Sequence, residues 1–255
     1  MKLNLEGKVA LVTGGSRGIG VAICKALAAE GMKVGLNYNK SAEKAEALAE
    51  EINCDSYPGS AFVMQADLSK PDAIAPMFDA VEKEYGQPVD VLVNNAAYCP
   101  SGPIEDYSVE DWEYTFSVNV TGVFVATQEA VKRLKAKNMK GAIVNISSQA
   151  AFLGSTSGHL PYDSSKGAVN SMTRAVAREV AEQGIRVNAI APGMVMTEMV
   201  AKIWEKKKDF YLSRIPLKRI AEPEEVANAV VFLASDAASF ITGTTLDLTG
   251  GLMMR

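Results

Sequence analysis

The chain alternates short, continuous apolar segments with longer segments whose apolar residues recur at helical spacing. The short segments do not alternate apolar with polar residues, so both of their faces must be buried, which is typical of parallel strands covered by helices on each side. We expect strands at 8–12, 34–38, 61–66, 89–93, 142–146, 186–190 and 244–248. We expect helices at 19–30, 42–52, 73–85, 109–137, 164–183, 198–213 and 223–234.

This alternation runs through all 255 residues without a repeat, a low-complexity tract or a linker. It predicts one α/β domain over 1–255, a doubly wound (Rossmann) parallel sheet of seven strands with helices on both faces. Such sheets bind ligands at the carboxyl ends of their strands, so the residues after each strand are the candidates for a site. Pro76 lies inside the third predicted helix, where we expect a kink or a late helix start.

Composition excludes several functional classes. The chain has 26 Lys and Arg against 30 Asp and Glu, a net charge of −4, so we expect no nucleic-acid partner. No apolar run reaches the roughly 18 residues of a membrane span. The polar N-terminus does not resemble a secretory signal, and we therefore expect a cytoplasmic protein without membrane contact. The 3 Cys and 1 His form no ligand cluster, so we expect no metal.

A glycine-rich turn separates the first predicted strand from the first predicted helix. Its glycines allow backbone N–H groups to approach an anion, and the N-terminus of the following helix adds its dipole. In this position the turn predicts a binding site for the pyrophosphate of a dinucleotide, although the spacing is G-x-x-x-G-x-G. The candidate residues are Gly14, Ser16, Arg17, Gly18, Ile19 and Gly20.

The residues after the second strand bear on the choice of cofactor. An acidic residue there binds the ribose 2′-hydroxyl of NAD, but Asn39 and Lys40 stand there, and no carboxylate occurs before Glu43. A carboxylate about 4 Å from a 2′-phosphate would cost on the order of 4 kcal/mol at an effective dielectric near 20. Its absence, with positive charge on Arg17 and Lys40, predicts NADP(H) over NAD(H). The alternative is a polar turn that accepts either cofactor.

Further candidates follow the third and fourth strands. Asp67 and Leu68 follow the third strand, where a carboxylate can accept a hydrogen bond from the adenine amino group. The alternative is that Asp67 caps a helix ahead of Pro71. Asn95 and Ala96 follow the fourth strand, where small side chains would let a ring or a ribose approach the backbone.

A serine, a tyrosine and a lysine form the catalytic candidate. Ser148 follows the fifth strand, while Tyr162 and Lys166 lie one turn apart on one face of the next predicted helix. A phenol has a pKa near 10, and an ammonium about 4 Å away in a shielded site supplies about the 4 kcal/mol needed to lower it to about 7. The pair can then act as a general acid–base. The serine hydroxyl can donate to a carbonyl oxygen whose charge grows during hydride transfer.

These motifs together resemble the short-chain dehydrogenase/reductase family over nearly the whole chain, and within it the 3-oxoacyl reductase-like and sugar dehydrogenase-like enzymes. The resemblance implies that Tyr162 exchanges the proton, that Lys166 also holds the nicotinamide ribose, and that Ser148 orients the substrate. A shift of one residue would give this last role to Ser147. It also implies that Asn119 keeps a water in a proton relay. It places the nicotinamide against Pro192, Gly193, Val195 and Thr197.

The predicted function is interconversion of a carbonyl and a secondary alcohol, with 3-oxoacyl reduction as the leading reaction. The alternatives are a sugar or polyol dehydrogenase, a hydroxysteroid dehydrogenase, a non-catalytic dinucleotide sensor, and a nucleotide-sugar epimerase or dehydratase. Family members are commonly tetramers, so we expect a homotetramer. A substrate cover is expected over about 194–215. The substrate-contact candidates, besides Ser148 and Tyr162, are His159, Met194, Met199 and Trp204. For His159 a solvated loop position is the alternative.

Overall fold

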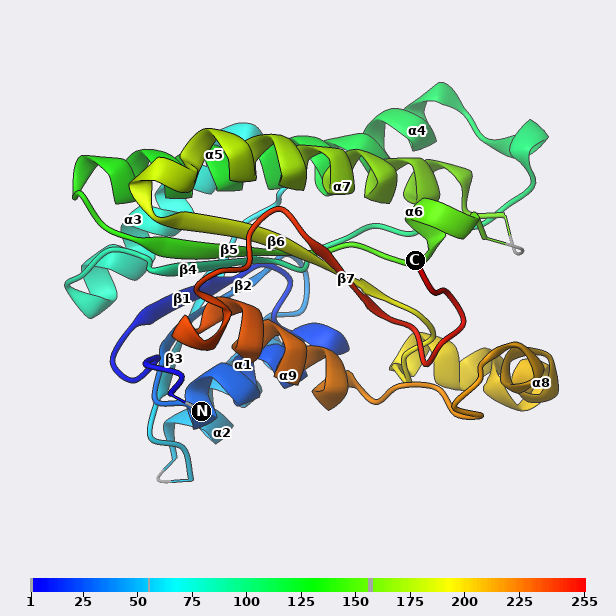
Figure 1. Cartoon of the computed structure of the whole chain (residues 1–255), viewed down its shortest axis with the longest axis horizontal. Coiled ribbons are helices and arrows are strands. Elements are labelled where there is room, and N and C mark those ends of the chain that lie inside the picture. Colours follow the sequence, from blue (N-terminus) through cyan, green and yellow to red (C-terminus); the bar gives the residue numbers. More distant parts are fainter. Residues whose placement is uncertain (1, 55, 156–157) are drawn as a thin grey trace.

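The computed structural model describes residues 2–54, 56–155 and 158–255, without the side chains of Met199, Lys202, Ile203 and Glu205. Its seven strands form one parallel sheet in the order β3-β2-β1-β4-β5-β6-β7 (Figure 1). The strands are β1 (Val9–Val12), β2 (Lys33–Tyr38), β3 (Ser60–Gln65), β4 (Val91–Asn94), β5 (Gly141–Ile146), β6 (Ile185–Pro192) and β7 (Thr245–Leu248). The helices are α1 (Ile19–Ala29), α2 (Ala42–Asn53), α3 (Ile74–Tyr85), α4 (Val109–Phe116), α5 (Gly122–Ala136), α6 (Ala150–Leu153), α7 (Leu160–Val180), α8 (Glu198–Arg214) and α9 (Pro223–Ala234).

Each central strand buries both of its faces, as the continuous apolar segments predict. In β1, Ala10 and Val12 pack into the core beneath α1, α2 and α9, whereas Val9 and Leu11 pack into the core beneath α3, α5 and α7. Figure 1 shows these two groups of helices on opposite sides of the sheet. The predicted fold class, a doubly wound parallel sheet of seven strands, is confirmed.

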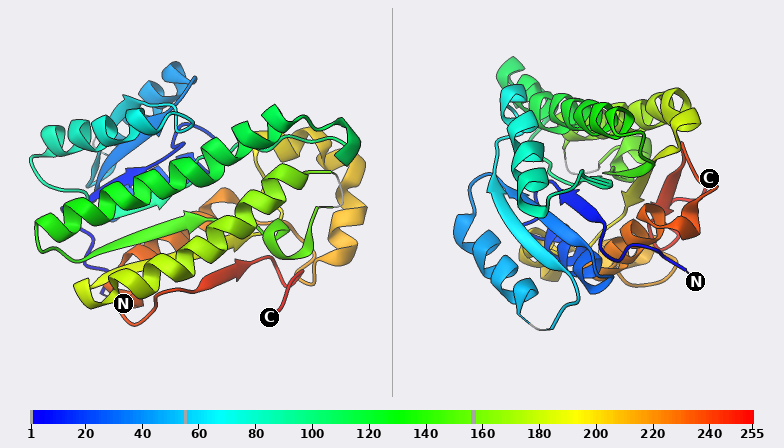
Figure 2. Two further views of the ribbon diagram at one scale, coloured as in Figure 1. Left: turned by 90° about the horizontal axis from the view of Figure 1, so that it is seen from above. Right: turned by 90° about the vertical axis from the view of Figure 1, so that its left-hand side faces the viewer.

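The strand order reverses beside β1, which pairs with β2 on one side and β4 on the other. The loops after these strands therefore diverge and leave a crevice at the carboxyl ends of the strands. Figure 2 shows α5 and α7 side by side across one face of the sheet. The N-terminal end of α7 reaches the same end of the molecule as α8.

The predicted helix over 109–137 is wrong as a single α-helix. A π-helical turn, Ser117–Thr121, separates α4 from α5. Such turns insert an extra residue and often occur at functional sites. Here the turn carries Asn119, whose fully buried amide binds the backbone of Tyr98. Helical periodicity does not reveal this insertion, because the partner of Asn119 lies in another loop.

Prolines mark the starts of two helices, α7 and α3, which were predicted to begin at 164 and 73. The helix α7 begins at Leu160, with Pro161 in its first turn, where a missing N–H breaks no helical hydrogen bond. The helix α3 begins at Ile74, directly after a 3₁₀ helix over Pro71–Ala73. Pro76 falls in the first turn of α3, where its missing N–H breaks no helical hydrogen bond, so α3 starts within one residue of the predicted position and needs no late start.

The helix α8 stands apart from the sheet at the carboxyl end of the strands (Figure 1). Two hydrogen bonds hold its base: Met196 N donates to Ala221 O at 2.8 Å, and Ala221 N donates to Met194 O at 2.9 Å. None of the α8 side chains that the structure describes is buried. In the described part of the chain, no helix has the length and apolar character needed to cross a membrane.

Candidate active site

A cleft of about 710 Å³ runs along the carboxyl ends of the strands. It is lined by the predicted residues Gly14, Ser16, Arg17, Gly18, Ile19, Asn39, Lys40, Asp67, Leu68, Asn95, Ala96, Ser148, Tyr162, Lys166, Pro192, Gly193, Met194, Val195 and Thr197. The predicted residues that do not line it are Gly20, Asn119, His159 and Trp204. The side chain of Met199 lies outside the described residues.

The glycine loop has the form of an anion cradle. Gly18 has φ 53° at the start of α1, a left-handed conformation that favours glycine, and no side chain caps this helix N-terminus. A Cβ on Gly20 would lie 2.2 Å from the Gly14 carbonyl oxygen, so the helix can approach the loop only without a side chain there. An uncapped helix N-terminus with no acidic residue in its first turn suits a pyrophosphate.

Hydrogen bonds from the neighbouring strands hold the glycine loop. The buried Thr13 hydroxyl accepts from Asn95 N at 2.9 Å and from Ala96 N at 3.1 Å. The Asn95 Nδ2 donates to the carbonyl oxygens of Thr13 and Gly14 at 2.9 and 3.0 Å. Asn37 Oδ1 accepts from Gly14 N at 3.2 Å. Sequence reasoning missed Thr13 and Asn37; a polar residue at the end of a buried strand was the available signal.

The adenosine end of the cleft carries few negative charges. Asn39 and Lys40 line this end, and Arg17 lies in the glycine loop. Among the described residues, the carboxylates that line the cleft are those of Asp67 and Glu198. Asp67 Oδ1 accepts from Ser69 N at 3.0 Å and from Ser69 Oγ at 2.8 Å, so it stabilises its own turn while facing the cleft. It does not cap the helix at Pro71, whose N-cap residue is Lys70.

Ser148, Tyr162 and Lys166 meet in this cleft. Lys166 Nζ lies 5.5 Å from the centroid of the Tyr162 ring and donates to the Ile146 carbonyl oxygen at 2.6 Å. The Ser148 side chain lies close enough to the Tyr162 hydroxyl to lower its pKa. Ser147 is buried instead, and its hydroxyl donates to the Lys166 carbonyl oxygen at 3.4 Å. The geometry thus puts Ser148, rather than Ser147, beside the phenol.

The pKa of Tyr162 is shifted in the opposite direction to the one that the sequence predicts. Burial raises its pKa above the ordinary value, and the nearby Ser148 side chain opposes this shift only in part. Burial lowers the pKa of Lys166 to about 8. The predicted lowering of the Tyr162 pKa is therefore wrong for this chain alone, because burial of the phenolate dominates and the ammonium is bound to Ile146 O.

The amide of Asn119 joins the π-helical turn to two other segments. Its Oδ1 accepts from Tyr98 N at 2.7 Å, and its Nδ2 donates to Tyr98 O at 2.8 Å and to Ser165 Oγ at 3.0 Å. Ser165 is fully buried and donates to the Tyr162 carbonyl oxygen at 2.6 Å. Both amide hydrogens of Asn119 are therefore used within the protein, and Ser165 links the turn to the helix that carries Tyr162.

Ser165→Ala is expected to lower the free energy of unfolding by about 1–3 kcal/mol, because it leaves a buried amide donor of Asn119 without its acceptor. Denaturant unfolding measures this change, and kcat should fall severalfold as the turn and α7 lose their link. Ser164→Ala removes the adjacent, half-buried hydroxyl and serves as the control. Equal stability of the two variants would contradict the assigned role of Ser165.

Only some of the predicted substrate-contact residues lie in the cleft. Met194 lines the cleft, but His159 Nδ1 lies 2.7 Å from the Pro100 carbonyl oxygen and 3.7 Å from Cys99 Sγ, outside the cleft lining. Trp204 is half-buried on α8. Tyr98 and Cys99, at the start of the loop 98–107 that the sequence predicts as a pocket wall, line the cleft together with Tyr114 and Val118, which were not predicted. The Tyr98 and Tyr114 rings pack edge to face with centroids 5.0 Å apart.

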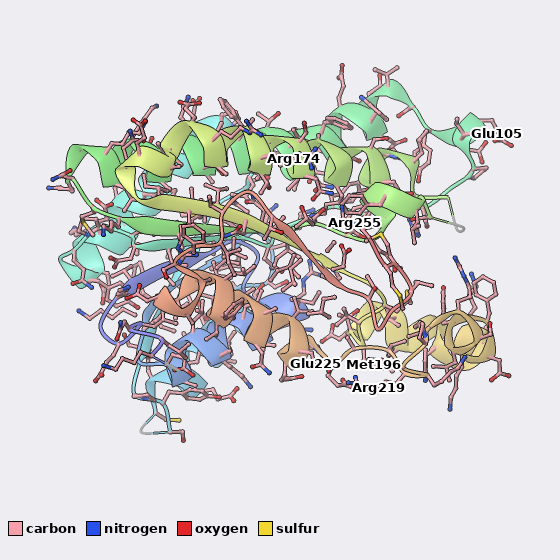
Figure 3. The ribbon with its side chains drawn as sticks, viewed as in Figure 1. Glu105, Arg174, Met196, Arg219, Glu225 and Arg255 are labelled. Atoms are coloured by element: carbon pink, nitrogen blue, oxygen red, sulfur yellow. The ribbon has the colours of Figure 1, made fainter. Side chains whose placement is uncertain are left out.

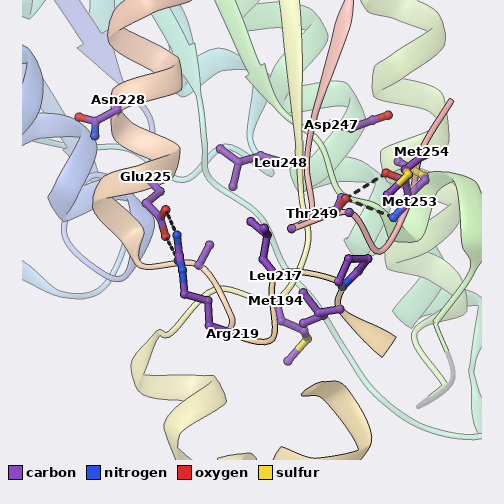
Figure 4. A pocket seen from close by; sticks show the side chains of 15 residues that line it. Met194, Leu217, Arg219, Glu225, Asn228, Asp247, Leu248, Thr249, Met253 and Met254 are labelled. Atoms are coloured by element: carbon purple, nitrogen blue, oxygen red, sulfur yellow. Dashed lines mark hydrogen bonds and ion pairs between the residues drawn. The ribbon is translucent and has the colours of Figure 1, made fainter. Parts of the chain in front are cut away.

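A second cavity of about 700 Å³ lies between the base of α8, α9 and the C-terminal segment (Figure 4). Arg219 and Glu225 lie together at the start of α9 (Figure 3) and form a two-pronged ion pair at 2.6 and 2.7 Å. Met194 belongs to both cavities, whereas Ser148, Tyr162 and Lys166 belong to the cleft alone. The cleft, rather than the second cavity, is therefore the candidate active site. The described residues contain no group of three or more potential metal ligands.

Comparisons with known proteins agree with this arrangement. Residues 14–253 match a family model described as Enoyl-(Acyl carrier protein) reductase. The chain is 40% identical over 247 residues to the 3-oxoacyl-[acyl-carrier-protein] reductase FabG of Staphylococcus epidermidis, with 97% of this chain and 99% of that protein covered. It superposes with a TM-score of 0.89 on a mutant short-chain dehydrogenase/reductase from Serratia marcescens, at 36% identity and with 97% and 98% of the chains covered.

The chain belongs to the short-chain dehydrogenase/reductase family. It is an oxidoreductase that acts on CH–OH or C=O groups with a dinucleotide cofactor. Another solved member of similar structure, a proposed 2-deoxy-d-gluconate 3-dehydrogenase from Agrobacterium tumefaciens, contains bound NADP. That structure has a TM-score of 0.88 and 34% identity, and the match covers 98% of each chain.

Proposed function

We propose that this short-chain dehydrogenase/reductase prefers NADP(H) and interconverts a carbonyl and a secondary alcohol, with a 3-oxoacyl compound as the leading substrate. The observation that carries the proposal is that Ser148, Tyr162 and Lys166 lie in the same cleft as the glycine loop. A non-catalytic dinucleotide sensor would not need these three side chains together. An epimerase or dehydratase of nucleotide sugars is disfavoured because such enzymes usually have a larger C-terminal portion.

The cleft suits a dinucleotide along its whole length. The glycine loop and the start of α1 would hold the pyrophosphate, Asp67 and Leu68 would contact the adenine, and Asn95 and Ala96 would lie beside the ribose and ring. Pro192, Gly193, Val195 and Thr197 would line the nicotinamide end. When bound there, the nicotinamide supplies or accepts the hydride.

The side chains at the nicotinamide end donate the proton and stabilise the charges that its transfer creates. In reduction, the protonated Tyr162 donates to the carbonyl oxygen, and Ser148 donates a hydrogen bond to the same oxygen as its negative charge grows. Lys166, charged below a pKa of about 8, stabilises the phenolate that Tyr162 becomes. The amide of Asn119 is bound to Tyr98 and Ser165, so its backbone carbonyl is the group that would hold a relay water.

The preference for NADP(H) rests on the adenosine end. Lys40 and Arg17 line the cleft there, and no carboxylate stands at the end of β2 to repel a 2′-phosphate. The NADP-bound relative at 34% identity supports the same choice. The homotetramer stays a prediction from the family resemblance, and the cytoplasmic location stays a prediction from the polar N-terminus.

The 3-oxoacyl assignment is supported by the FabG relative, which has 40% identity over 97% of this chain. Sugar or polyol oxidation is the runner-up, because the solved relative with NADP is a proposed 2-deoxy-d-gluconate 3-dehydrogenase. A hydroxysteroid remains the third candidate.

A substrate panel tests the proposed function. Oxoacyl thioesters, enoyl thioesters, sugars, polyols and steroids are assayed at 340 nm with NADPH and NADH in parallel. The expected result is fastest turnover of a 3-oxoacyl thioester, with kcat/KM at least about tenfold higher for NADPH than for NADH. Comparable kcat/KM values with both cofactors would refute the cofactor preference, and turnover confined to another class would refute the substrate assignment.

A further inference from the structure

We propose that the ion pair between Lys44 and Glu198 forms a latch across the cofactor cleft. The 2′-phosphate of NADP(H) breaks this ion pair by binding Lys44 in place of Glu198. Lys44 then acts as a residue that selects the cofactor, and Glu198 sets how tightly NADP(H) binds. This inference rests on the proposed function, because it assumes that a dinucleotide occupies the cleft.

The latch joins segments that are far apart in the sequence. Lys44 Nζ lies 2.8 Å from Glu198 Oε1 and 3.1 Å from Glu198 Oε2, across a separation of 154 residues. Lys44 is in the first turn of α2, three residues after Ser41, which lines the cleft with Lys40. Glu198 is the first residue of α8 and itself lines the cleft. The pair therefore connects the adenosine side of the cleft to the expected substrate cover.

The start of α8 lies beside the glycine loop as well. A Cβ on Gly18 would be 3.6 Å from Thr197 Cγ2, and Thr197 is the N-cap residue of α8. None of the described side chains of α8 is buried. The ion pair with Lys44 therefore joins the first turn of α8 to the first turn of α2.

The charges of the cleft explain why a 2′-phosphate would compete for Lys44. Of the two carboxylates among the described lining residues, Asp67 is bound to Ser69, so Glu198 is the one that directs its charge toward Lys44. A 2′-phosphate at the end of β2 adds up to two negative charges, which attract Lys44 and repel Glu198. The side chains of the pair are 53% and 73% exposed, and ion pairs this exposed are weak enough to be displaced.

The two cofactors therefore have different effects. NADP(H) draws Lys44 to its phosphate and away from the start of α8, which loses this one contact, whereas NAD(H), with a neutral 2′-hydroxyl, leaves the latch closed. Glu198 opposes NADP(H) binding, both by holding Lys44 and by its own negative charge. Binding of NAD(H) does not depend on either side chain.

The test measures cofactor binding directly, without substrate, by the fluorescence of NADPH and NADH. Glu198→Gln is expected to tighten NADPH binding about two- to fivefold, and Lys44→Gln to weaken it by a similar factor, with NADH unchanged in both. In the double variant the gain from Glu198→Gln should be smaller, because the two side chains act through each other. Asp209→Asn, which removes an exposed carboxylate farther along α8, is the matched control.

Hydrogen exchange gives a second readout that does not use activity. Amides in the first turns of α8 should exchange faster with saturating NADP⁺ than with saturating NAD⁺, and this difference should vanish in Lys44→Gln. The latch would be refuted if a variant changed the Kd for NADPH and the Kd for NADH by the same factor, or if no variant changed either Kd. It would also be refuted if Asp209→Asn changed the Kd for NADPH as much as Glu198→Gln does. None of these results would refute the proposed function. If the wild type binds neither dinucleotide, the proposed function fails together with the latch.

Discussion

Tyr162→Phe is expected to lower kcat by about 10²–10⁴-fold while Kd for NADPH changes less than about twofold. The change removes the hydroxyl that the structure places against Ser148 and near Lys166, but it keeps the ring and its packing. Steady-state rates with the best substrate of the panel, and NADPH binding measured by fluorescence, separate the two effects. The loss should appear in kcat because the hydroxyl acts in the transition state.

Tyr85→Phe provides the control for loss of a phenol. Tyr85 lies away from the cleft and donates to the Val34 carbonyl oxygen at 3.2 Å, so its removal should lower the free energy of unfolding by about 1 kcal/mol and leave kcat unchanged. A Tyr162→Phe enzyme with more than a tenth of the wild-type kcat would show that another group donates the proton.

Gly20→Ala is expected to weaken dinucleotide binding by about tenfold or more and to lower the free energy of unfolding by about 1–3 kcal/mol. The added Cβ would lie 2.2 Å from the Gly14 carbonyl oxygen and 2.8 Å from Asn95 Nδ2. Both groups belong to the hydrogen-bonded frame of the glycine loop, so the loop must move. Denaturant unfolding and NADPH fluorescence measure the two losses.

Gly167→Ala is the matched control, because it makes the same substitution within another helix. The nearest atom to its Cβ would be the Ala151 carbonyl oxygen at 3.9 Å, which is ordinary contact. Alanine favours the helix over glycine, so this variant should gain about 0.5–1 kcal/mol of stability. If Gly20→Ala bound NADPH as well as Gly167→Ala does, the cradle assigned to the glycine loop would be wrong.

Most of the fold could be predicted from patterns along the chain. The continuous apolar segments indicated a sheet with both faces covered, and the glycine-rich turn after the first strand indicated its ligand-binding end. The π-helical turn at Asn119 could not be found this way, because the buried contact with Tyr98 that stabilises it joins residues 21 positions apart. Tyr114 and Val118 could not be predicted for the same reason: nothing in their local sequence shows that they line a cleft.

The amino-acid sequence by itself determined the family, the parallel sheet and the identity of the Ser148, Tyr162 and Lys166 candidates, since these follow from periodicity and from motifs at fixed spacing. The tertiary structure alone decided that Ser148 rather than Ser147 lies beside the phenol, and that Lys44 meets Glu198. It also reversed the expected direction of the Tyr162 pKa shift. The physical reason is that hydrogen-bond partners and burial are set by segments that are distant in the chain, and burial controls the energy of a buried charge.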